Sequence, residues 1–151
     1  MVFRNAMPRE ANAITELTLA SKNHWGYPKE WMTLWADDLT ITSEYIENNM
    51  VVVAEDGNNL LGYVSVKKDD GEYYLDNLFV CPAHIKKGIG IKLLAFAHDW
   101  CREHGVARLH VYSDPFSKGF YEKTGAVFVK DVASEVISGR SLPFLTYHLQ
   151  I

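Results

Sequence analysis

Short apolar, β-branched runs separated by polar turns are the most regular feature of the chain. Residues 50–55, 60–67 and 72–80 form three such runs, and the segments "DGNN" and "DDG" between them are typical of tight turns. We therefore expect an antiparallel meander. Further strands are predicted over residues 2–6, 106–112, 126–132 and 143–151. The last run alternates, which places four residues on one face: Leu145, Tyr147, Leu149 and Ile151.

The first third of the chain has helical spacing instead. Pro8 is compatible with a first helical turn, and apolar residues then recur at helical intervals, at Ala13, Ile14, Leu17 and Ala20. The segment "HWGYP" at 24–28 ends this helix, because glycine and proline disfavour its continuation.

Two more helices are predicted before the meander. The first should carry Trp31, Leu34 and Trp35 on one face. A short one should follow Thr42, because Glu44 is then favourably placed in its first turn.

A long helix is predicted after Gly88 and Gly90. Its apolar face is broad, and Gly105 suits the position just beyond its end; the face comprises Leu93, Leu94, Ala97, Trp100 and Cys101. A shorter helix is predicted within 114–125, with Pro115 near its start.

The main elements follow the order β-α-α-β-β-β-α-β-α-β-β. This order predicts an α/β (layered α+β) fold, with a mixed central sheet of six to seven strands flanked by helices and one strand–helix–strand crossover. The 151 residues suit a single domain over 1–151.

Composition excludes several classes of protein. Charged residues make up 23% of the chain and hydrophobic residues 48%, and the net charge of −4 argues against general binding to nucleic acid or to an anionic membrane. No apolar stretch approaches the roughly 20 residues of a membrane span, and the N-terminus lacks a signal-peptide core, so we expect a cytoplasmic protein. The histidines show no metal-ligand spacing, so no metal is expected.

The segment "HIKKGIGIKLL" at 84–94 places two glycines at the start of a helix. The first N–H groups of a helix have no intrahelical partner, and glycines let an anion approach them, so a phosphate is a natural ligand. The third glycine of the dinucleotide-binding fingerprint and the GK[ST] of the Walker motif are both absent. A tight strand-to-helix turn without a ligand explains the glycines equally well.

The wider context resembles the GNAT superfamily of N-acetyltransferases. The run "LFVCPAHIKKGIGIKLLAFAHDWCREHG" at 78–105 is similar to the family's signature segment, and "DPFSKGFYEKTGA" at 114–126 is similar to its later motif. The segments "SKNHWGYPKEWM" and "GRSLPFL" resemble one bacterial branch of the superfamily. Two motifs in the right order, with matching elements, cover most of the chain.

The resemblance implies a site for acetyl-CoA, the cosubstrate. Main-chain groups of the glycine segment would cradle the pyrophosphate, and this role falls on Ile85, Lys86, Lys87, Gly88, Ile89 and Gly90. The preceding strand would bulge and splay, so that Leu78, Phe79 and Val80 pair with the pantetheine arm. An amide near Val80 would polarise the thioester carbonyl. Ile85 stands where the family has Arg or Gln, so that side-chain donor is absent. Main-chain N–H groups would make most of the phosphate contacts, and Lys86 or Lys87 could add charge or be solvated surface residues.

The later motif would supply the general acid. Tyr121 matches the tyrosine that protonates the departing CoA thiolate, a role suited to a phenol with a pKa of about 10. The alternative is a tyrosine packed against the sheet with Phe120. Asp114 stands where many members have Asn, and Ser117 replaces a common Ala; these two residues, Phe120 and Tyr121 would also contact the cofactor.

The general base is less specified. Asp76 lies ahead of the expected bulge and, with regular pleating, shares a face with Tyr74 and Leu78. It could accept the amine's proton directly or through water, attract the ammonium, or serve only as a structural residue; Glu72 is the reserve candidate.

The acceptor wall is predicted from the loop at 24–28, where Trp25 and Tyr27 could hold a cation or a flat ring. Trp31 and Trp35, four residues apart, suit the core.

We therefore expect direct transfer of an acetyl group from acetyl-CoA to a primary amine of a small molecule or peptide. Cys81 lacks a partnered histidine, so a covalent route through its thiol is less favoured. The alternatives are a noncatalytic sensor of CoA or acyl-CoA and an interaction module on the same fold. A homodimer through edge strands is compatible with such a fold.

Overall fold

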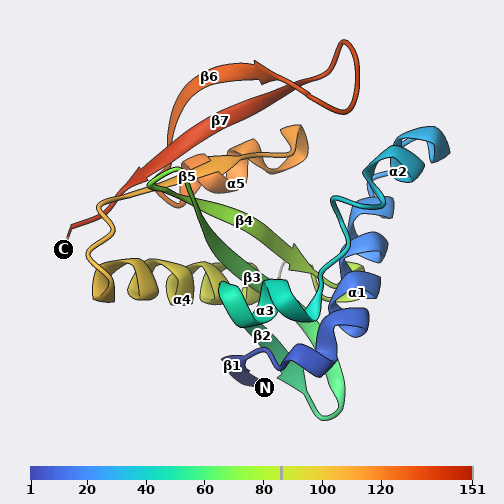
Figure 1. Ribbon diagram of the computed structural model, residues 1–151, viewed down its shortest axis with the longest axis vertical. Helices are drawn as coiled ribbons and strands as arrows, with labels where there is room; N and C mark the ends of the chain where they lie inside the picture. The colour runs from blue at the N-terminus through green and yellow to red at the C-terminus, as the bar shows by residue number, and fades with distance from the viewer. Residues whose placement is uncertain (86, 151) are drawn as a thin grey trace.

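The computed structural model describes residues 1–85 and 87–150, and its centre is one mixed sheet (Figure 1). The seven strands follow the order β1-β2-β3-β4-β5-β7-β6. They are β1 (Val2–Asn5), β2 (Met50–Asp56), β3 (Asn59–Asp69), β4 (Glu72–Val80), β5 (Arg108–Tyr112), β6 (Val127–Ala133) and β7 (Ser141–His148). Strands β4 and β5 pair in parallel, and the other neighbours are antiparallel. The predicted fold class and meander are confirmed.

In the described part of the chain, five α-helices accompany the sheet: α1 (Ala11–Asn23), α2 (Lys29–Trp35), α3 (Ser43–Asn48), α4 (Ile89–Glu103) and α5 (Lys118–Lys123). The short helix expected after Thr42 is α3, and the Thr42 hydroxyl accepts the Tyr45 amide as an N-cap. Gly105 follows α4 with φ +69°, and Gly125 follows α5 with φ +108°. Both helices therefore end at the glycines that were predicted to end them.

The two faces of the sheet carry separate cores. On one face, α4 buries Leu93, Leu94, Ala97 and Cys101 against alternate residues of the central strands. Tyr121 of α5 belongs to the same core, and so do Leu145 and Tyr147 of β7. On the other face, α1 and α3 cover Val53, Tyr63 and their neighbours. Leu149 packs beyond the end of β7, as expected, whereas Ile151 lies outside the described residues.

The β4 strand departs from regular pleating at Asp76. Ser65 pairs with Asn77 and Val66 with Leu75, so Asp76 is an extra residue in the ladder, a β-bulge. Strand β5 pairs with β4 only at Tyr73 and Tyr74. The carboxyl-terminal half of β4 therefore separates from β5, because a bulge bends the strand that contains it.

Helix α2 packs against the loop between β6 and β7. Trp35 is buried with Leu39 and Ile137, and Ile137 belongs to that loop. Leu34 was expected on the same face but is 57% exposed. The buried side of this short helix runs through Trp31, Met32 and Trp35, which turns Leu34 outward.

No helix among residues 1–85 and 87–150 is long and apolar enough to cross a membrane.

Gly62 tests the packing beneath the gap. A Cβ at this position would lie 2.8 Å from the Phe79 carbonyl oxygen and 3.2 Å from Leu93 Cδ1. Gly62→Ala should therefore lower the free energy of unfolding by about 1–3 kcal/mol, because backbone of β4 must shift. Urea unfolding measures the loss.

Gly119→Ala is the matched control, since this α5 glycine has no atom within 4 Å of its added Cβ. It should raise stability by about 0.5–1 kcal/mol, the usual gain from alanine in a helix. A neutral Gly62→Ala would contradict tight β3–β4 packing.

Candidate active site

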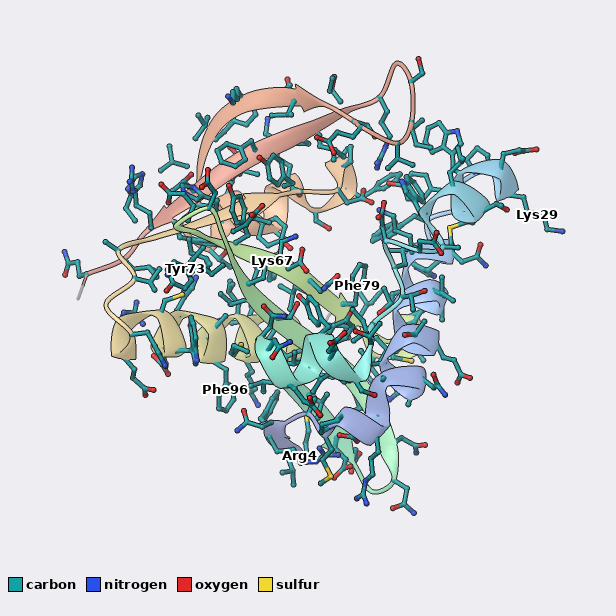
Figure 2. All side chains as sticks on the ribbon, viewed as in Figure 1. Arg4, Lys29, Lys67, Tyr73, Phe79 and Phe96 are labelled. Carbon is teal, nitrogen blue, oxygen red and sulfur yellow. The ribbon has the colours of Figure 1, made fainter. Side chains whose placement is uncertain are left out.

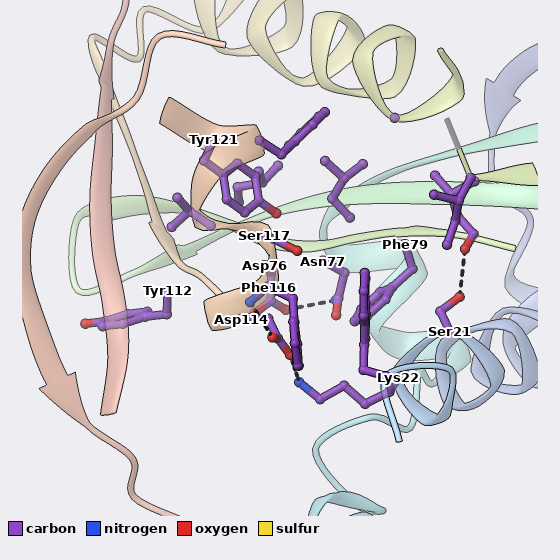
Figure 3. A pocket seen from close by; sticks show the side chains of 18 of the residues that line it. Ser21, Lys22, Asp76, Asn77, Phe79, Tyr112, Asp114, Phe116, Ser117 and Tyr121 are labelled. Atoms are coloured by element: carbon purple, nitrogen blue, oxygen red, sulfur yellow. Dashed lines mark hydrogen bonds and ion pairs between the residues drawn. The ribbon is translucent and has the colours of Figure 1, made fainter. Parts of the chain in front are cut away.

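A cleft of about 700 Å³ opens where β4 and β5 separate (Figure 3). Its walls come from the end of α1, the second half of β4, the start of α4 and the segment between β5 and α5. The predicted site residues that line it are Trp25, Asp76, Leu78, Phe79, Val80, Ile85, Gly88, Gly90, Asp114, Ser117, Phe120 and Tyr121. Residues from three distant parts of the sequence thus meet in one cavity.

Three predicted residues are placed otherwise. Ile89 is 1% exposed and packs in the core, so only its main chain is available to a ligand. Lys87 and Tyr27 do not line the cleft. Lys86 lies outside the described residues.

The start of α4 presents free main-chain donors to the cleft. Gly88 is the N-cap with φ +80°, a left-handed conformation that favours glycine. The Gly88 carbonyl accepts the first hydrogen bond of the helix, from Lys92 N at 3.2 Å. The amides of residues 89–91 come before this bond, so they have no partner within the helix. A Cβ on Gly88 would meet nothing within 4 Å. The corner is open to an anion, which the helix dipole also favours.

The edge of β4 supplies a second set of main-chain groups. Cys81 N donates to Leu61 O at 2.7 Å, and hydrogen-bonded pairs alternate along an antiparallel ladder. The main-chain groups of Phe79 therefore face β3, whereas those of Leu78 and Val80 face the gap. The Val80 carbonyl accepts from Ser21 Oγ at 3.0 Å. The predicted main-chain contacts thus fit Leu78 and Val80, while Phe79 lines the cleft with its side chain (Figure 3).

Tyr121 is buried beside this edge, at 7% exposure. Its ring packs edge-on against Phe120 and Tyr147, and no group of the described residues hydrogen-bonds its hydroxyl. The side chain lines the cleft (Figure 3). Burial, followed by the nearby Tyr147 and Asp114, raises the pKa of Tyr121, so the phenol stays protonated at neutral pH and can donate.

Asp76 lines the cleft from the face of the sheet opposite to Leu78, with which regular pleating would place it. Because of the bulge, Asp76 and Asn77 both turn toward α3, whereas Leu78 packs on the α4 side. Asp76 Oδ2 accepts from the Tyr45 hydroxyl at 2.5 Å, and Lys67 Nζ lies 3.3 Å from Oδ1. The shared face with Leu78 was wrong because it assumed regular pleating.

Glu72, the reserve candidate for the base, lies outside the cleft. Its carboxylate is 3.0 Å from His110 Nε2 and 3.6 Å from an Arg108 nitrogen. These pairs tie β4 to β5 and leave Asp76 as the carboxylate of β4 that faces the cavity.

Asp114 is the centre of a charged cluster that no sequence signal indicated. Its Oδ2 accepts from Lys22 Nζ at 2.8 Å, and its Oδ1 accepts from the Tyr27 hydroxyl at 2.6 Å and from the Phe116 amide at 3.1 Å. Arg140 Nη2 donates to the Tyr27 hydroxyl at 3.0 Å and lies 3.6 Å from Oδ2. These contacts occupy most of the acceptor capacity that was assigned to the cofactor.

Burial and charge oppose each other in this cluster. Burial acts to raise the pKa of Asp114, but the charge of Lys22 and the hydrogen bonds from Lys22, Tyr27 and Phe116 outweigh it, and the pKa is lowered. Burial lowers the pKa of Lys22, and Asp114 offsets this only in part. The surroundings therefore stabilise the negative charge of Asp114 more than the positive charge of Lys22.

The two aromatic candidates for the acceptor wall have different environments. Trp25 is 40% exposed, lines the cleft and stacks on Phe116 with ring centroids 4.8 Å apart. Tyr27 packs against Trp31 and Trp35, so its ring supports the charged cluster instead of facing the cavity. Burial, then Asp114, raises the pKa of Tyr27 and keeps its hydroxyl a donor.

Several lining residues were not predicted: Ser21, Lys22, Asp38, Leu39, Asn77, His84, Ile91, Tyr112 and Phe116. Phe116 lies inside the second motif and could have been selected from it. Asn77 could not, because only the bulge turns it to the same face as Asp76. Lys22 and Asp38 reach the cleft through tertiary packing alone.

The comparisons with known proteins agree with this geometry. The sequence profile of the acetyltransferase (GNAT) family matches residues 12–126, so the chain belongs to that family. A search of the curated proteins gives no match.

Solved structures share the fold across nearly the whole chain. A GCN5-related N-acetyltransferase from Rhodopseudomonas palustris has a TM-score of 0.83 at 20% identity, covering 98% of this chain and 95% of its own. The PaiA N-acetyltransferase of Thermoplasma acidophilum, in complex with coenzyme A, has a TM-score of 0.80 at 18% identity, with coverages of 97% and 98%. YncA of Salmonella typhimurium, with its cofactor acetyl-CoA, has a TM-score of 0.72 at 22% identity, with coverages of 100% and 95%.

The charged cluster predicts a pH-dependent stability. Asp114→Asn leaves Lys22 and Arg140 without a carboxylate and should lower the free energy of unfolding by about 3 kcal/mol near neutral pH. The folded-state pKa of Asp114 is lowered. The extra stability of the wild type over Asp114→Asn is therefore fully present above the unfolded-state pKa of about 4 and is lost as pH falls through the folded-state pKa. Urea unfolding of both proteins from about pH 3 to pH 7 measures this difference.

The double variant Lys22→Met/Asp114→Asn removes one cation together with the carboxylate, so it should recover part of the loss. A pH-independent difference would contradict the ionised pair.

Proposed function

We propose that the chain transfers an acetyl group from acetyl-CoA to a primary amine by direct attack. The observation that supports this most is one cleft that joins the free amides of α4, the open edge of β4 and the Tyr121 hydroxyl. Family membership supports acetyl transfer, and the CoA and acetyl-CoA of the similar structures support the cosubstrate.

Acetyl-CoA would lie across the splayed strands. The amides at 89–91 suit its pyrophosphate, and the main-chain groups of Leu78 and Val80 suit the amides of its pantetheine arm. The Val80 N–H would then donate to the thioester oxygen as negative charge develops on it. Ile85, Ser117 and Phe120 would line the path of the arm.

The acceptor amine would enter beside Asp76. An ammonium must lose its proton before it can attack, and Asp76 would attract it and accept that proton directly or through water. The amine nitrogen then bonds to the thioester carbon, the carbon–sulfur bond breaks, and Tyr121 protonates the departing thiolate. The proton that the nitrogen loses as it becomes an amide restores the Tyr121 hydroxyl through water. Cys81 does not line the cleft, in keeping with direct transfer.

Tyr121→Phe tests the general acid. It should lower the single-turnover rate of acetyl transfer by about 100-fold or more, because proton transfer to the leaving group is lost, while affinity for acetyl-CoA is kept. Rapid-quench kinetics and calorimetric titration measure the two quantities.

Tyr147→Phe is the matched control, since its hydroxyl bonds to Thr124 at 2.7 Å outside the cleft. It should lower stability by about 1 kcal/mol and leave the rate unchanged. An unchanged rate in Tyr121→Phe would eliminate the tyrosine mechanism, and acetyl-CoA binding without any turnover in the wild type would favour a sensor.

Gly90→Glu tests the pyrophosphate site. A Cβ here would make only ordinary contacts, 3.7 Å from Phe120 and 3.8 Å from Val80, and a carboxylate in the first turn is compatible with the helix dipole. The variant should fold but bind acetyl-CoA at least about 100-fold more weakly, through like-charge repulsion. S-acetyl-pantetheine, which lacks the pyrophosphate, should bind both proteins equally.

Gly90→Ala adds the Cβ without charge and should keep most of the affinity for acetyl-CoA. Equal affinity of Gly90→Glu and Gly90→Ala would remove the start of α4 from the cofactor site.

A further inference from the structure

The charged cluster beside the cleft holds more positive than negative charge. Lys22 and Arg140 share the single carboxylate of Asp114, and the three side chains are only 13%, 10% and 15% exposed. Tyr27, the other polar member, is a neutral donor. A cation held away from water without a matching anion is costly, so an excess of one positive charge is unusual in such a place.

Lys22 is the cation that can present this excess to a ligand. It lines the cleft, whereas Arg140 lies behind it among the rings of Tyr27, Trp31 and Trp35. The ammonium has three donors, and Asp114 is its one charged partner among the described residues. Its other contacts are the faces of two aromatic rings, Trp35 at 4.4 Å and Tyr27 at 5.1 Å, which accept no conventional hydrogen bond. Donor capacity is therefore left over.

The two remaining carboxylates of the cleft do not remove the excess. Asp76 is paired with Lys67, and Asp38 forms no ion pair with a cation of the described residues. Asp38 is available to a positively charged group of a ligand, and Asp76 keeps acceptor capacity beside its contacts with Lys67 and Tyr45, because a carboxylate can accept several hydrogen bonds. The cleft thus offers negative charge at Asp76 and Asp38 and positive charge at Lys22.

We propose that Lys22 binds a carboxylate of the acceptor, so that the preferred acceptors are amines that also carry a carboxylate, such as free amino acids. The proposal rests on the amine acetylation proposed above, and it adds the charge pattern of the acceptor. The ammonium of such a molecule faces Asp76 before transfer, and its carboxylate faces Lys22. The Trp25–Phe116 stack and the half-exposed Tyr112 leave apolar surface for a side chain.

Matched substrate pairs test this assignment. Each pair consists of an amino acid and its decarboxylated amine: phenylalanine and phenethylamine, leucine and 3-methylbutylamine, lysine and 1,5-diaminopentane. The wild type should prefer the amino acid in at least one pair by about 10- to 100-fold in kcat/KM, the worth of a hydrogen bond between charged groups. Release of free CoA thiol measures each rate.

Lys22→Met removes the charge and keeps the length of the side chain. It should fold, because Arg140 and Asp114 then balance one to one. The preference for the amino acid should fall by about 10-fold or more, through a higher KM for the amino acid, while the KM for acetyl-CoA stays within about twofold. A rise in the KM for acetyl-CoA instead would assign Lys22 to the cofactor and overturn the proposal.

Lys29→Met is the control, because it removes the same charge from an exposed lysine at the outer end of α2 (Figure 2). It should leave the ratio of kcat/KM between the two members of each substrate pair unchanged. Equal use of both members of all pairs by the wild type, use of other amines only, or an unchanged ratio in Lys22→Met would each overturn the proposal.

A binding measurement separates this proposal from the proposed function. In the presence of CoA, N-acetylphenylalanine should raise the melting temperature more than N-acetylphenethylamine does, and Lys22→Met should abolish the difference. If no amine is acetylated, the proposed function fails, and this measurement still decides whether Lys22 recognises a carboxylate. No difference in the wild type counts against the proposal.

Discussion

The separation of β4 from β5 is the constraint on which the rest of the site depends. Two parallel pairs, at Tyr73 and Tyr74, hold the strands together, and the bulge at Asp76 then bends β4 away. Main-chain groups that would complete a ladder in a continuous sheet are thereby left facing a cavity. The same bend brings the carboxylate of Asp76 to the rim of that cavity. Because β4 and β5 are not paired beyond this point, a ligand can lie between them.

Packing on the two faces of the sheet keeps the cavity open. Helix α4 is fixed by a buried apolar face, so its amino-terminal amides stay aimed at the gap. On the other face, the hydroxyl of Ser21 in α1 binds the Val80 carbonyl, and the Thr18 hydroxyl lies 2.6 Å from the Tyr63 hydroxyl. These contacts position the edge of β4 from both sides, which suits a site that must hold a flexible cofactor in one orientation.

The charged cluster joins segments that are distant in the sequence. Lys22 lies in the last turn of α1, Asp114 follows β5, and Arg140 belongs to the loop before β7, so one carboxylate ties three segments together. The surrounding rings of Tyr27, Trp31 and Trp35 exclude water, which strengthens each ionic contact and increases the cost of imperfect charge balance. The two ion pairs with Asp114 therefore stabilise this side of the cleft and also leave one positive charge without a matching carboxylate.

The sequence alone determined the elements and one end of the cleft. Alternation and turn residues predicted the meander, helical spacing predicted α4, and the pair Gly88 and Gly90 marked its start, because these signals are local. Cleft residues from both motifs, including Val80 and Tyr121, were predicted from the resemblance to the GNAT superfamily. The opposite faces of Asp76 and Leu78, the exposure of Leu34 and the cluster around Asp114 were not predicted. A bulge shifts pleating by one residue, a short helix buries whichever side meets its neighbours, and an ion pair between residues 22 and 114 leaves no periodic trace. Only the tertiary structure decided these features, because each depends on which distant surfaces come into contact.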